Sequence, residues 1–216
     1  MMKKRHLPLL GLALSLPLFW LAIANYPGGN DWDTAAAGFS FTENYVSALF
    51  QPKAINGTPN SARVFAIPAM LIFCTCISFL FWAISKHTQH RVTGKVIQIF
   101  GIGSMVYTFL GVCTVMHDLL VLIAAAFFVI AVIGMLFMSH TLRRPESMLG
   151  GLFCLAFLIA LGVMRHGNVR LDLAPITEWL LFALSTAWLT FAYYTATTSN
   201  NSFKPNLLRS TNNVAD

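Results

Sequence analysis

The sequence predicts an all-α integral membrane protein, a bundle of six transmembrane helices. Six segments, each of a length near that of a membrane span, contain no Asp, Glu, Lys or Arg. They are residues 7–30, 64–85, 96–116, 119–142, 147–164 and 179–203. About 20 apolar residues at 1.5 Å rise cross the roughly 30 Å hydrocarbon core of a bilayer. Each segment therefore meets or approaches the length of a membrane span.

The low charge content supports the same fold class. Charged residues make up 10% of the chain and hydrophobic residues 56%, whereas soluble domains usually carry about 25% charged residues. Ionised side chains are costly in hydrocarbon, so membrane burial requires this deficit. The net charge of +6 is scattered in short clusters without a basic stripe, so we expect no nucleic-acid partner.

The distribution of basic residues predicts the orientation. With a cytoplasmic N-terminus, ten basic residues lie on the inner side and four on the outer side. The inner set is Lys3, Lys4, Arg5, Lys86, Arg91, Lys95, Arg143, Arg144, Lys204 and Arg209, and the outer set is Lys53, Arg63, Arg165 and Arg170. Cytoplasmic loops carry an excess of Lys and Arg, so both termini are predicted to be cytoplasmic.

The first three helices are expected at about 7–25, 64–85 and 96–116. A cluster of breakers from Asn25 to Gly29 ends the first helix. Its basic start and the motif Ala22-Ile23-Ala24 leave open whether it is a cleaved signal peptide. The second helix tolerates Pro68 in its first turns. In the third helix, small residues permit close approach of neighbouring helices; these are Gly101, Gly103, Ser104, Thr108 and Gly111.

The last three helices are expected at about 119–140, 148–165 and 175–197, which completes a membrane domain over 1–196. Ala124–Ala126 and Gly150-Gly151 are further close-packing patches. Pro175 opens the sixth helix, and Glu178 in its first turn suits the positive end of the helix dipole. The polar tail 197–216, rich in Ser and Asn, is predicted to be a disordered cytoplasmic segment.

A long outer loop joins the first and second helices. It is polar and aromatic, and Asn44–Phe50 could form a short interfacial helix with Thr42 as its N-cap. Loops of this length without regular structure are usually functional or disordered. The aromatic content favours a folded cap over the outer mouth of the bundle.

Acidic residues gather at the predicted outer face. Together with the histidines and arginines there, they are Asp31, Asp33, Glu43, Asp118, Asp172, Glu178, His117, His166, Arg165 and Arg170. The sequence places no ionisable group at mid-membrane depth, which disfavours a proton relay or a substrate path through the bundle centre.

The outer residues allow three interpretations. His117, Asp118 and His166, with Glu178, could bind zinc. Alternatively, Arg165 and Arg170 could bind a lipid phosphate while His117 or Asp118 binds a headgroup hydroxyl or amine. The third interpretation is that these residues only neutralise and cap helix ends at the water boundary. Ser47 is a candidate nucleophile, although no base stands at a defined spacing from it.

Two motifs carry a resemblance to a known family. Residues 39–49 (FSFTENYVSAL), followed by 56–60 (NGTPN), are similar to the first outer loop of the DUF998 family, bacterial six-helix membrane proteins of unassigned function. Residues 116–120 (MHDLL) resemble the start of that family's fourth helix. The family has distant kin among Frag1/DRAM-type proteins and ceramidase-like membrane hydrolases. The resemblance implies that Ser47, His117 and Asp118 are the catalytic candidates.

The chain departs from those hydrolases, because its last predicted helix carries no histidine. We therefore expect a multi-pass protein of the bacterial inner membrane without a cofactor, non-catalytic, engaging a lipid headgroup or a protein partner at its periplasmic face. The ligand-binding candidates are Glu43, His117, Asp118, Arg165, His166, Arg170 and Glu178. The alternative is a zinc-dependent membrane lipid hydrolase that uses the outer His and Asp residues.

Overall fold

Six long helices build the computed structural model, which describes residues 6–210 and side chains up to residue 198. They are α1 (Leu7–Ala24), α2 (Arg63–Ser85), α3 (Arg91–Cys113), α4 (His117–Thr141), α5 (Pro145–Gly167) and α6 (Ala174–Ser210). Two short 3-10 helices, η2 (Val46–Phe50) and η3 (Leu171–Leu173), lie in the connections. All six long helices are long and apolar enough to cross a membrane. The all-α, six-helix prediction is thereby confirmed.

Two helices run further than the sequence predicted. α3 begins at Arg91 rather than near residue 96, since helical hydrogen bonding continues into a polar segment. α6 continues to Ser210, although 197–216 was expected to be a disordered tail. No Gly or Pro interrupts residues 197–204, and extending a formed helix costs far less than nucleating one. Residues 211–216 lie outside the described part of the chain.

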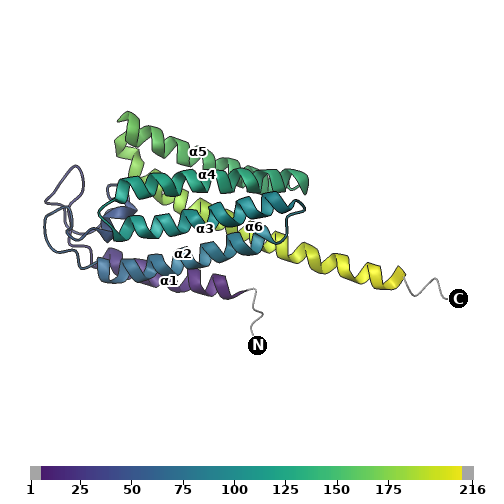
Figure 1. The fold of residues 1–216 in the computed structure, drawn as a ribbon. Coiled ribbons are helices and arrows are strands. Elements are labelled where there is room, and N and C mark those ends of the chain that lie inside the picture. Colours follow the sequence, from purple (N-terminus) through teal and green to yellow (C-terminus); the bar gives the residue numbers. More distant parts are fainter. Residues whose placement is uncertain (1–5, 211–216) are drawn as a thin grey trace.

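The interfacial helix expected over Asn44–Phe50 is a single turn of 3-10 helix, Val46–Phe50. Its N-cap residue is Tyr45, which makes no side-chain capping bond, so the expected cap at Thr42 is wrong. Residues 25–62 nevertheless fold over one end of the bundle (Figure 1). We call this the loop end, and the other the opposite end.

Five helices form a ring. Each of α2 to α5 packs against the next helix, and α6 packs back on α2. α1 packs against α2 and lies at the edge of the bundle in Figure 1. The five helices α2 to α6 therefore enclose the interior of the protein.

Glycines let aromatic side chains approach the neighbouring backbone. Gly101 of α3 lies against Phe81 of α2, and Gly150 and Gly151 of α5 lie against Trp188 of α6. Between transmembrane helices, close van der Waals contact replaces the hydrophobic driving force that acts in water. Phe81 and Trp188 belong to one core cluster together with Ile97, Met135 and Leu189, and this cluster closes the interior toward the opposite end.

Replacing Gly101 by alanine tests this packing. The added Cβ would lie 2.8 Å from Phe81 Cβ, so overpacking should cost about 1–3 kcal/mol of unfolding free energy. Gly162→Ala is the matched control, because a Cβ there meets nothing within 4 Å and alanine favours the helix. Thermal unfolding in detergent should show a lower midpoint only for Gly101→Ala. Equal midpoints for the two variants would contradict the packing described.

Candidate functional site

A cavity of about 160 Å³ lies inside the ring, in the half nearer the loop end. All five ring helices and η2 contribute to its wall. Most of the wall is apolar, with Met70 and Phe73 from α2, Met105 from α3, Phe128 from α4 and Phe182 from α6. A cavity lined in this way favours an apolar occupant over water.

Seven polar side chains interrupt the apolar wall: Ser47, Ser104, Thr108, His117, Glu178, Ser185 and Thr186. The four hydroxyls on α3 and α6 donate to carbonyls of their own helix, at 2.7 to 3.2 Å. Their hydrogens are therefore already used. Ser47, His117 and Glu178 remain as the polar groups of the cavity, and they come from η2, α4 and α6.

Buried asparagines hold the segment that covers the cavity. Asn44 is 1% exposed; its Nδ2 donates to Gly29 O at 2.8 Å and its Oδ1 accepts from Ser40 N at 2.9 Å. Asn60 Nδ2 donates to Ala48 O and Gln51 O, both at 2.9 Å. An asparagine side chain both donates and accepts, so it can replace the regular backbone pairing that the loop lacks. The loop is therefore ordered without strands or long helices of its own.

α6 attaches η2 to the bundle. Glu178 Oε2 accepts a hydrogen bond from Val46 N at 2.8 Å, at the first residue of η2. Trp179 Nε1 donates to Asn44 O at 3.3 Å. The Trp179 ring also contacts Phe39 and Phe41 edge-on, with centroids 5.9 and 5.1 Å apart. Two successive residues at the start of α6 thus hold the cover of the cavity in place.

His117 begins α4 and is half-buried at the cavity wall. Its Nδ1 lies 3.0 Å from Gly111 O. Among the hydrogen bonds of residues 6–198, none joins His117 to Ser47 or to Glu178. Hydrolytic catalysis through Ser47 would use a hydrogen-bonded nucleophile, base and acid. In this arrangement Ser47, His117 and Glu178 are not joined by such hydrogen bonds.

The other predicted site residues lie outside the cavity. Glu43, Asp118 and His166 are exposed, and Glu43 Oε2 accepts from Asn30 Nδ2 at 2.8 Å. Arg165 is stacked on Tyr45, with its Cζ 4.9 Å from the ring centroid. Burial raises the pKa of the Tyr45 phenol, and the charge of Arg165 opposes that shift.

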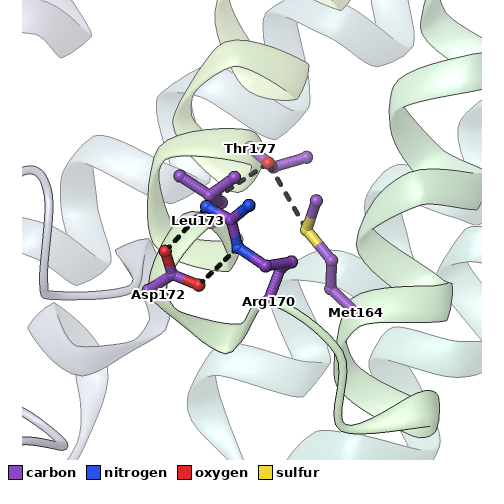
Figure 2. Close-up of polar contacts among 5 residues, drawn as sticks. All are labelled: Met164, Arg170, Asp172, Leu173 and Thr177. Atoms are coloured by element: carbon purple, nitrogen blue, oxygen red, sulfur yellow. Dashed lines mark hydrogen bonds and ion pairs between the residues drawn. The ribbon is translucent and has the colours of Figure 1, made fainter.

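Arg170 is held by an acidic neighbour, as Figure 2 shows. Its Nε and Nη2 donate to the two carboxylate oxygens of Asp172 at 3.1 and 3.0 Å. The Nε/Nη2 edge of the guanidinium, one of its edges suited to bidentate phosphate binding, is therefore already occupied. The same view shows Thr177 Oγ1 donating to Leu173 O and to Met164 Sδ, which connects α6 to α5.

Within the part of the chain whose side chains are described, no group of three or more His, Cys, Asp or Glu could hold a metal ion. His166 therefore does not join His117 and Asp118 in one metal-binding group. The zinc interpretation gains no support from this geometry, and it stays a hypothesis.

Sequence reasoning missed the cavity and the buried asparagines. Asn30, Asn44 and Asn60 stand in a long loop near Gly, Ser and Pro residues, a setting that is typical of turn-forming Asn. That signal marks turns but does not show which asparagines are buried. No local sequence pattern marks the cavity, because its polar residues stand far apart in the chain. Ser47 and Glu178, for example, are 131 positions apart.

In comparisons with known proteins, no family model, curated protein or solved structure matches this chain. The fold and the site define a six-helix protein whose helices can span a membrane and whose interior holds a covered apolar cavity. The DUF998 resemblance stays a prediction.

Asn44→Ala tests whether the buried asparagine orders the cover. The change removes two hydrogen bonds of a buried amide, so we expect a loss of about 2 kcal/mol or more of unfolding free energy. Thermal unfolding in detergent and protease cleavage within residues 25–62 are the measurements. Asn25→Ala is the control: Asn25 is exposed, and its amide bonds only to Leu21 O of the same helix. Equal stability and equal cleavage of the two variants would show that the Asn44 side chain does not order the loop that covers the cavity.

Proposed function

We propose that this protein binds an apolar lipid chain in its interior cavity, as a multi-pass protein of the bacterial inner membrane with both termini cytoplasmic. The observation that carries the proposal is the covered, mostly apolar cavity at the loop end. In the proposed orientation the loop end faces the periplasm. Lipid engagement at that face is the function we expected from the sequence, with the binding site inside the bundle rather than at the exposed arginines.

The chemistry of the wall supports an apolar occupant. Filling the space gives dispersion contacts to side chains that otherwise face a void. Along the apolar part of the wall water is a poor alternative, since a buried water needs two to four polar partners and the four helical hydroxyls there already donate their hydrogens to carbonyls. An alkyl chain drawn from the surrounding bilayer meets these conditions.

The divergence of α4 and α5 supports entry from the membrane. Near the opposite end these helices are in contact, where Ser139 Oγ donates to Ser147 Oγ at 3.0 Å and Gly151 lies against Leu136. Toward the loop end their ribbons separate in Figure 1. Val121 of α4 and Leu158 of α5 both line the cavity there, so we propose that a chain enters between the two helices.

Filling the cavity with a side chain tests this function. Ala125 lines the cavity and is half-buried, so Ala125→Trp should occupy the space an alkyl chain would take. The probe is hexadecanol carrying a photoreactive diazirine on its chain, and mass spectrometry of detergent-purified protein locates the labelled peptides. We expect label on cavity-lining peptides in the wild type and its loss in Ala125→Trp.

The control places the same side chain on the outer face of the same helix. Leu122 is 56% exposed, so Leu122→Trp should keep the wild-type labelling. Equal labelling of cavity peptides in both variants would overturn the proposal, because occupation of the interior would then make no difference.

A further inference from the structure

Three polar side chains of the cavity lie at its loop end. Ser47, His117 and Glu178 line the same cavity. They lie at the ends of their elements nearest the loop end, while the rest of the wall is apolar or carries hydroxyls that donate to their own helix. A ligand with one polar end and one apolar chain would place its head among these three residues.

His117 offers an acceptor to the cavity. A carbonyl oxygen only accepts, so the Nδ1 that lies 3.0 Å from Gly111 O carries the hydrogen and donates it. In the neutral ring the other nitrogen, Nε2, is then a lone-pair acceptor. The ring is held in this tautomer by the backbone at the end of α3.

Glu178 offers a second acceptor. Its Oε2 takes the Val46 N–H, and no hydrogen bond among the described residues uses its Oε1. A carboxylate has about four lone-pair sites, so most of its accepting capacity is left over. Ser47, half-buried and likewise without a described hydrogen bond, can accept as well as donate.

No Lys or Arg lines the cavity. The guanidinium of Arg165 is stacked on the Tyr45 ring, and Arg165 is not part of the wall. A phosphate head would therefore meet hydrogen-bond acceptors without a Lys or Arg beside them, which is unfavourable. A hydroxyl or ammonium head would meet acceptors.

We propose that the ligand is a single-chain amphiphile whose head is a hydrogen-bond donor, a long-chain alcohol or amine. Its head is bound by Ser47, His117 and Glu178, and the first part of its chain fills the apolar remainder of the cavity. The rest of the chain extends between α4 and α5 into the bilayer. This inference rests on the proposed function and adds the chemistry of the head. One interpretation of the sequence placed a headgroup hydroxyl or amine at His117 or Asp118 and a phosphate at Arg165 and Arg170; the inference keeps the hydroxyl or amine and drops the phosphate.

The test compares three photoreactive probes that share one hexadecyl chain and differ in the head: hexadecanol, hexadecylamine and hexadecyl phosphate. Full-length protein in detergent is labelled with each, and the labelled peptides are mapped. We expect the alcohol and the amine to label cavity-lining peptides at least about tenfold more efficiently than the phosphate, since the phosphate would meet acceptors and no Lys or Arg.

Two variants assign the head to its residues. Glu178→Gln keeps an acceptor for Val46 N but removes the charge, so amine labelling should fall about tenfold while alcohol labelling changes little. Glu43→Gln is the control, because Glu43 is an exposed carboxylate outside the cavity wall. Ser47→Ala removes no described hydrogen bond, so it should leave the fold intact and lower alcohol labelling about threefold.

The outcomes separate the two proposals. Phosphate labelling equal to that of the alcohol would overturn the donor-head inference and leave lipid binding in the cavity standing. Cavity labelling by none of the three probes would overturn lipid binding itself. An unchanged amine-to-alcohol ratio in Glu178→Gln, together with unchanged alcohol labelling in Ser47→Ala, would show that these side chains do not bind the head.

Discussion

The contact between α6 and η2 is the constraint on which the loop-end half of the protein depends. Glu178 accepts the Val46 N–H, and Trp179 donates to Asn44 O. Two neighbouring residues of one helix thus hold the backbone of a loop more than 130 positions away in the sequence. Without this contact the cover of the cavity would lose its hydrogen bonds to α6, and Glu178 would lose its described hydrogen-bond partner.

The cavity persists because the two ends of the bundle are closed by different means. At the opposite end, glycines let Phe81 and Trp188 pack tightly into the backbones of neighbouring helices. At the loop end, hydrogen-bonded asparagines and an aromatic cluster replace helix-to-helix packing. Helices in lipid lack the hydrophobic force that would collapse a space between them. The cavity, in the half of the ring nearer the loop end, can therefore stay open to an apolar chain.

The sequence predicted the six helices, since the length of an apolar run is a local property and the bilayer sets the length required. It also named Ser47, His117 and Glu178 among the site candidates: Ser47 as a possible nucleophile, and His117 and Glu178 as polar residues at the outer ends of apolar helices. It could not show that these three share a cavity, which depends on how α4, α6 and η2 pack. The same limit explains Arg170, which looked available for a phosphate but is occupied by its neighbour Asp172. Asn44 was expected at the start of a short interfacial helix, whereas it precedes η2 and its buried side chain organises the cover.

The decisive measurement is a structure of the protein determined in a lipid nanodisc. Our account predicts that Glu178 remains hydrogen-bonded to Val46 N above a cavity that holds continuous, chain-shaped density reaching toward Met105 and Phe182. A structure in which α4 and α6 close against each other and side chains fill the space between them would contradict it.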